Sequence, residues 1–197
     1  MAVRATRLLQ RGFVLEFITL GWNAVGVLVL AVSAFAAHSV ALAGFGLDSL
    51  VEIGASIVVV WELRGIGDVG RQRRALRLIG SAFFALAAYI AAQGAYVLAT
   101  GIRPEHSSVG IVWTAVTCLV MLALAYGKSV TGRALGNRVL STEGRVTLVD
   151  AYLAGAVLIG LVLNAALGWW WADPVAGFAI LFYGVIEGRA AWANSAP

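Results

Sequence analysis

The chain has 197 residues, of which 61% are hydrophobic and only 12% are charged, and its mean hydropathy is +0.89. These values exclude an ordinary soluble domain and indicate an integral membrane protein. The net charge of +4 does not point to nucleic acid, because the basic residues fall in short clusters between apolar runs, which is the pattern of membrane topology.

Six apolar segments predict a bundle of six membrane-spanning helices, since about 20 apolar residues are needed to cross a bilayer. The first segment has arginines ahead of it, as a secretory signal does, but its apolar run is too long for a signal and contains Glu16 and Asn23. We therefore interpret it as a span. The predicted spans are 13–37, 40–63, 78–99, 109–126, 146–167 and 174–191.

The second span, 40–63, carries Asp48 and Glu52 near its midpoint. Four residues apart, they share one helical face, and Gly44 and Ser56 extend that face by a turn in each direction. An ionised carboxylate at this depth costs about 3 kcal/mol or more, so a cation is expected beside the pair. A divalent metal ion would neutralise both charges. The alternative is an Arg or Lys from another helix, although the predicted spans before the sixth contain none.

The third and fourth spans are uncharged, and the loops around them differ in charge. A basic loop, 64–77, precedes the third span, and a short polar loop with Arg103 separates the third span from the fourth. The fourth span is followed by another basic segment, which holds Lys128, Arg133, Arg138 and Arg145.

The fifth span, 146–167, contains Asp150 close to its start. If this helix begins earlier, near Leu140, Asp150 lies deeper and Glu143, two turns before it on the same face, lines an entrance from the cytoplasm. A solvated loop residue is the alternative for Glu143.

Two residues of the first span are candidates to support a site on the second. Glu16 and Asn23 share one helical face, and Asn23 lies about 16 Å from the cytoplasmic end, at the depth of Glu52. Asn23 can therefore line the same cavity, or it can form an interhelical hydrogen bond.

The sixth span is the weakest of the predictions, because its apolar run is short. Interfacial tryptophans at 169–171 precede it, and Arg189 and Trp192 can anchor its far end. With six spans and both termini in the cytoplasm, Arg103 is the only one of the 14 basic residues on the outer side. We expect the inner membrane of a cell as the location.

Three stretches resemble the cation diffusion facilitator family of divalent-metal exporters. They are Ser39-Val40-Ala41-Leu42 leading into Leu47-Asp48-Ser49-Leu50-Val51-Glu52, then Thr147-Leu148-Val149-Asp150 followed by Gly155-Ala156-Val157-Leu158-Ile159-Gly160, and Trp171-Ala172-Asp173-Pro174. The resemblance implies a site with two ligands on the second helix and two on the fifth, exchange of metal for protons, and a homodimer.

Asp48, Glu52 and Asp150 match three of the family's four ligand positions. The fourth, usually His or Asp, is Val146, which cannot coordinate, so water, Asn23 or another oxygen must complete the site. An all-oxygen set suits manganese, iron(II) or magnesium better than zinc, and cobalt remains possible. The family's cytoplasmic C-terminal domain is also not expected here, so that a homodimer would be held by membrane helices.

These residues predict a proton-coupled exporter of a divalent cation, with the metal as substrate and no prosthetic group. The rival hypothesis is a membrane scaffold or metal-sensing subunit that does not transport. An enzyme is not expected, because no nucleophile is paired with a histidine and both histidines, His38 and His106, fall in outer loops.

Overall fold

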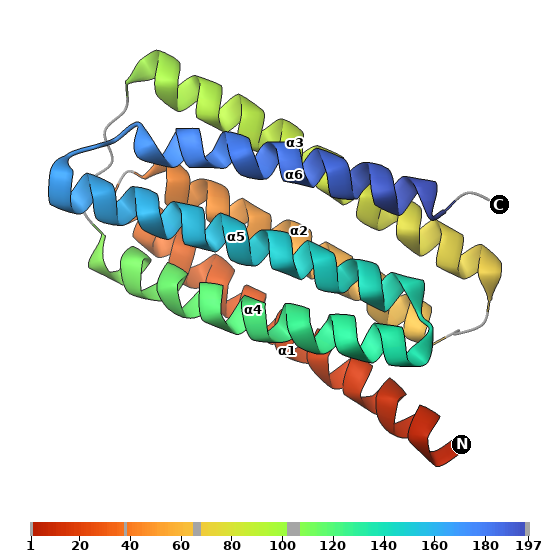
Figure 1. Cartoon of the computed structure of the whole chain (residues 1–197). Helices are drawn as coiled ribbons and strands as arrows, with labels where there is room; N and C mark the ends of the chain where they lie inside the picture. The colour runs from red at the N-terminus through yellow and green to blue at the C-terminus, as the bar shows by residue number, and fades with distance from the viewer. Residues whose placement is uncertain (1, 38, 65–67, 102–106, 196–197) are drawn as a thin grey trace.

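The residues that the structure describes form a bundle of six helices (Figure 1). The structure is a computed structural model that describes residues 2–37, 39–64, 68–101 and 107–195, without the side chains of 40, 41, 51, 172–180, 183 and 187 and those before residue 5. The helices are α1 (Ala2–Ala37), α2 (Val40–Leu63), α3 (Val69–Thr100), α4 (Ser108–Leu135), α5 (Arg138–Leu167) and α6 (Ala172–Ala193).

Local sequence signals fix the ends of the helices that carry the acidic residues. Ser39 precedes α2, and its hydroxyl accepts a hydrogen bond from the Leu42 backbone N–H at 3.2 Å. Asn137 caps α5 in the same way, at 2.8 Å from the Leu140 N–H. Gly136, with a φ of 63°, ends α4 in the left-handed region that favours glycine. Because only Gly136 and Asn137 separate them, α4 and α5 form a tight antiparallel hairpin.

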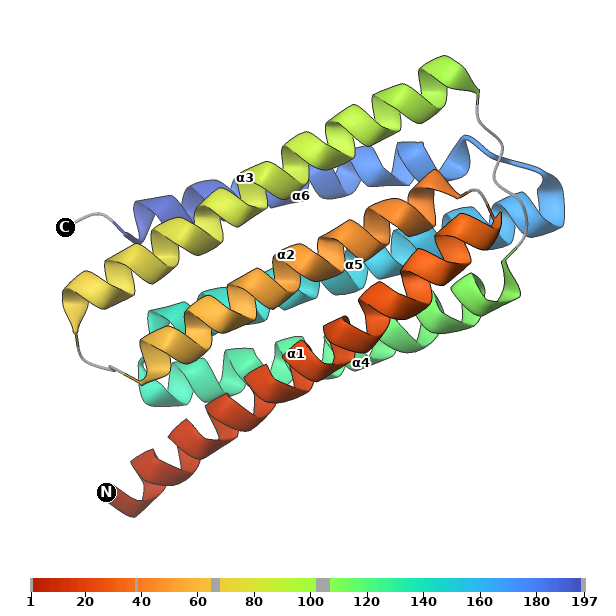
Figure 2. The ribbon, with the colours of Figure 1, turned by 180° about the vertical axis from the view of Figure 1, so that it is seen from behind.

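The helices α2 and α5 occupy the centre of the bundle. The α3 and α6 pair packs on one side of them and the α1 and α4 pair on the other (Figure 1), and α2 lies between α1 and α3 in the view from behind (Figure 2). The two helices that carry Asp48, Glu52 and Asp150 are therefore the most enclosed, and they contact each other directly.

The helices extend beyond several of the predicted spans, which changes the environment of the residues between them. The structure begins α5 at Arg138 rather than at 146, so Asp150 lies about 18 Å along its helix. It continues α4 to Leu135, nine residues past the predicted end at 126. Our placement of Lys128 in a basic segment outside the spans is therefore wrong, because this residue belongs to α4.

The predicted six-helix fold is confirmed, and the exterior suits a bilayer. Among the described residues, five stretches are long and apolar enough to cross a membrane: Ala5–Ala37, Leu42–Leu63, Val69–Thr100, Ser108–Leu135 and Arg138–Leu167. Large apolar side chains such as Phe35, 84% exposed, point outward. His38 and His106 lie outside the described residues, as do half of the side chains of the predicted sixth span.

Close approach of α4 and α5 depends on glycines at their interface. A Cβ atom on Gly144 would lie 2.8 Å from the Ser129 backbone nitrogen and 3.2 Å from the Ala125 carbonyl oxygen, so the two helices would have to move apart. On the exposed face of α1, a Cβ on Gly21 would meet nothing within 4 Å.

We predict that Gly144→Ala destabilises the protein by about 1 to 3 kcal/mol, because overpacking outweighs the better helix propensity of alanine. Gly21→Ala, the matched control, should be neutral or stabilising by up to about 1 kcal/mol. The thermal unfolding midpoints of the purified variants in detergent measure this. Equal midpoints for the two variants would show that α4 and α5 are not in the close contact described.

Candidate metal site

Two of the three predicted ligands face each other across the centre of the bundle. Asp48 on α2 and Asp150 on α5 are each 3% exposed, and their carboxyl groups interact across the contact between the two helices. Oδ2 of Asp48 and both carboxyl oxygens of Asp150 are buried without a hydrogen-bond partner. Two ionised carboxylates cannot remain in contact at low dielectric unless a proton or a cation lies between them. We call these two residues the aspartate pair.

The third predicted ligand, Glu52, lies one helical turn from Asp48 and has a partner of its own. Glu52 is 2% exposed, and its Oε1 accepts a hydrogen bond of 2.7 Å from the hydroxyl of Thr147 on α5. Its carboxylate interacts electrostatically with Asp48 and Asp150.

Further polar pairs follow toward the end of α2, because α2 and α5 run antiparallel. Ser56, one turn after Glu52, donates to Oε1 of Glu143, one turn before Thr147, at 3.5 Å. At the end of α2, the Asn137 side-chain N–H₂ donates to both carboxyl oxygens of Glu62, at 3.2 and 3.0 Å. Polar pairs thus line the contact between α2 and α5 from the aspartate pair to this end of the bundle.

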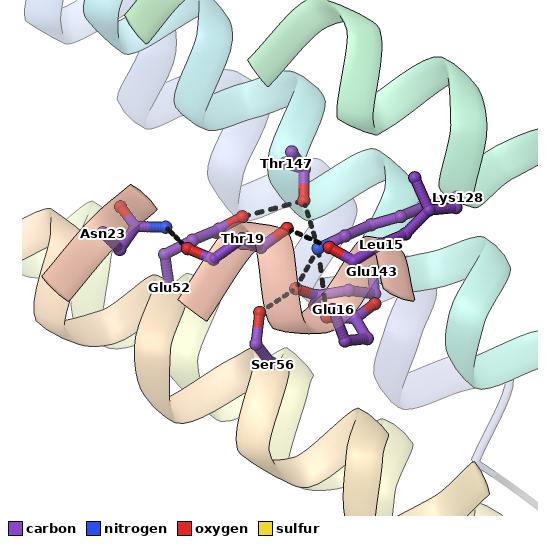
Figure 3. A network of polar contacts seen from close by, with 9 residues as sticks. All are labelled: Leu15, Glu16, Thr19, Asn23, Glu52, Ser56, Lys128, Glu143 and Thr147. Atoms are coloured by element: carbon purple, nitrogen blue, oxygen red, sulfur yellow. Dashed lines mark hydrogen bonds and ion pairs between the residues drawn. The ribbon is translucent and has the colours of Figure 1, made fainter. Parts of the chain in front are cut away.

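The charge that the acidic residues need comes in part from Lys128, which is fully buried. Its ammonium nitrogen lies 3.2 Å from Oε2 of Glu16 on α1 and 3.1 Å from Oε1 of Glu143 on α5, and it donates to the Thr147 hydroxyl at 3.0 Å (Figure 3). An ammonium has three N–H donors, of which two form the hydrogen bonds to Glu143 and Thr147, while the contact with Glu16 is an ion pair. The alternative that we considered was a basic partner from another helix for Asp48 and Glu52, whereas the ion pairs of Lys128 are with Glu16 and Glu143.

The three residues predicted to support the site have different roles in the structure. Glu143 is fully buried, so the alternative of a solvated loop residue is wrong. Glu16 is also fully buried and pairs with Lys128. The Asn23 side chain is 1% exposed, and its N–H₂ group donates to the Thr19 carbonyl oxygen of its own helix at 3.1 Å. Val146 packs in the apolar core.

The described side chains do not form a complete metal centre in this conformation. No group of three or more His, Cys, Asp or Glu residues in the described part of the chain is arranged to hold a metal ion. The aspartate pair offers three unpartnered carboxyl oxygens, which are suitable ligands for a hard divalent cation. Glu52 is the nearest candidate for a further ligand along α2, and it is turned to Thr147 instead.

Hydropathy alone did not predict that Lys128 is buried in α4, although the sequence of α4 contains a pattern that indicates it. The residues Thr114, Thr117, Lys128 and Thr131 recur at helical spacing and are all buried. This polar face continues past the end of the apolar run. A basic residue on the same face as buried threonines indicates a helix that points a charge into the bundle.

Comparison with known proteins identifies a family and a relative. The cation efflux transmembrane domain matches residues 75–196, which contain α4, α5 and Asp150 but not α2. The chain is also similar to transmembrane protein 163 of Xenopus laevis, with 25% identity over 183 residues that cover 83% of this chain. The chain covers 63% of the length of that relative.

We predict that Lys128→Met destabilises the fold by about 3 to 5 kcal/mol, because it leaves Glu16 and Glu143 buried without their cation. The unfolding midpoint in detergent gives the effect. A triple variant that also carries Glu16→Gln and Glu143→Gln should recover most of the loss. If Lys128→Met alone is as stable as the parent protein, the buried ion pairs are not formed.

Proposed function

Because the chain belongs to the cation efflux family, we propose that it exports a divalent metal cation across the membrane in exchange for protons. The observation that carries this proposal is the aspartate pair, two buried carboxyl groups that interact from separate central helices, with three oxygens that lack hydrogen-bond partners. Such an arrangement needs a cation or a proton, and it accepts either one.

In the proposed cycle, deprotonated Asp48 and Asp150 take up the metal ion from the cytoplasmic side, and Glu52 joins them as a third ligand. The helices then change their packing, so that the pair opens to the opposite side. Protons from that side replace the metal on the carboxyl oxygens, and the neutral site returns. Exchange follows from the chemistry, since a carboxylate must lose its proton to bind metal.

The ligand chemistry favours a hard cation. The proposed ligands provide carboxylate oxygens, and Asn23 and water provide further oxygens, whereas structural zinc sites prefer nitrogen and sulfur. We therefore propose manganese or iron(II) as substrate, with cobalt as the next candidate and zinc less favoured. We further propose that the working unit is a homodimer held by membrane helices, with both termini in the cytoplasm.

We predict that Asp48→Asn and Asp150→Asn each reduce Mn²⁺ uptake into proteoliposomes at least a hundredfold, because each removes an ionised ligand from the pair. Asp68→Asn is the matched control, since Asp68 is an exposed cap of α3 and asparagine caps a helix equally well. This control should transport like the parent protein. Transport that survives either substitution in the pair would refute the proposed site.

The same experiment separates transport from the rival function. A protein that binds Mn²⁺ through the aspartate pair but shows no flux in proteoliposomes under any pH gradient is a metal-sensing or scaffold protein. Metal-dependent flux in the same proteoliposomes would identify the protein as an exporter.

We also predict that Mn²⁺ binding releases protons from the purified protein. Calorimetric titrations in buffers with different enthalpies of ionisation should give binding enthalpies that differ in proportion, and binding should weaken as the pH falls. Identical enthalpies in all buffers would mean that no proton is exchanged, and the antiport mechanism would then be wrong.

A further inference from the structure

Thr147 behaves differently from the other helical threonines whose hydroxyl group the structure gives as a hydrogen-bond donor. Four threonines donate their hydroxyl proton to the carbonyl oxygen four residues earlier in their own helix, as threonines in helices commonly do. They are Thr19, Thr100, Thr114 and Thr131. Thr147 donates across the helix interface to Oε1 of Glu52, at 2.7 Å.

Lys128 gives this hydrogen bond its direction. A hydroxyl has one proton and can also accept, whereas an ammonium group can only donate. The Thr147 oxygen accepts from Lys128 at 3.0 Å, so its single proton is free to point at Glu52 (Figure 3). The ammonium cannot turn away, because Glu16 and Glu143 hold it on two further sides.

The position of Glu52 follows from this arrangement. Its carboxylate is held by Thr147 while the oxygens of the aspartate pair, one turn away, remain without partners. A metal ion on the pair that uses Glu52 as a ligand must compete with this hydrogen bond.

We propose that Lys128, acting through Thr147, is a positioning device that withholds Glu52 from the aspartate pair. Glu52 then becomes a metal ligand only when its bond to Thr147 opens. The inference rests on the proposed function, since it assigns a control element to the same site. Its consequence is a lower apparent affinity for metal, because part of the binding free energy is spent on releasing Glu52. A lower affinity suits a transporter, because the metal ion must also dissociate from the site.

The test is Mn²⁺ binding to the purified full chain, measured by calorimetry on Thr147→Val. Valine has the shape of threonine without the hydroxyl, so Glu52 is freed while the packing is kept. One hydrogen bond contributes about 0.5 to 1.5 kcal/mol net, which corresponds to a dissociation constant about two- to twelvefold lower than that of the parent protein. Thr114→Val is the matched control, since Thr114 is a buried threonine of α4 that bonds only within its own helix. Its affinity should not change.

The same substitution in a protein that already carries Glu52→Gln distinguishes this mechanism from a general effect on the fold. With Glu52→Gln already present, adding Thr147→Val should leave the affinity unchanged, because the residue to be released is no longer a charged ligand. Absorption spectra of bound Co²⁺ give an independent signature, since they respond to the ligand set: Glu52→Gln should change the spectrum, whereas Thr147→Val should leave it as in the parent protein. Should Thr147→Val fail to fold, Thr147→Ala removes the same hydroxyl without adding volume.

Unchanged or weaker Mn²⁺ binding by the hydroxyl-free variant would overturn the inference, as would tightening that persists with Glu52→Gln. Either result leaves the proposed function standing if Asp48→Asn and Asp150→Asn abolish binding. Binding that survives those two substitutions overturns the proposed function itself.

Discussion

The constraint on which the structure depends is an imbalance of buried charge. Buried acidic side chains occur on three helices: Glu16, Asp48, Glu52, Glu62, Glu143 and Asp150. Among the described residues, Lys128 is the one buried basic side chain. One ammonium group cannot compensate for all of these carboxyl groups, so the bundle must acquire protons or cations to bury them. A function that exchanges one for the other uses this requirement directly.

The distribution of hydrogen bonds divides the buried acids into two classes. Glu16 and Glu143 pair with Lys128, Glu62 is bonded by Asn137, and Glu52 by Thr147. These contacts join α1, α2, α4 and α5, and they restrict the helix packing toward the end of α2. The aspartate pair is the exception among the described acids: three of its oxygens lack a hydrogen-bond partner and it has no ion pair, whereas the unbonded oxygens of Glu16 and Glu143 belong to side chains that pair with Lys128. Unsatisfied buried polar groups are rare in folded proteins, and this group lies where cation chemistry is expected.

The antiparallel register of α2 and α5 brings these groups together. The polar side chains that recur at helical spacing on α2 lie opposite polar side chains that recur on α5. Together they form a line of paired groups along the contact between the two helices. The α4 and α5 hairpin adds Lys128 to this line. Its two-residue connection fixes the register, and Gly132 and Gly144 permit the close approach. Relative movement of α2 and α5 would change the partners along this line, and the proposed transport cycle requires such a movement.

The sequence by itself determined the six-helix membrane fold and the shared face of Asp48 and Glu52, because apolar length and helical periodicity are local properties. Only the tertiary structure decided which acidic residues meet and which already have a cation. Lys128 was assigned to a loop because hydropathy averages over a segment and penalises a charge. The folded protein buries this charge because Glu16 and Glu143, both distant in sequence from the end of the apolar run, surround it. Compensation between helices is a property of three-dimensional packing, and no single segment contains it.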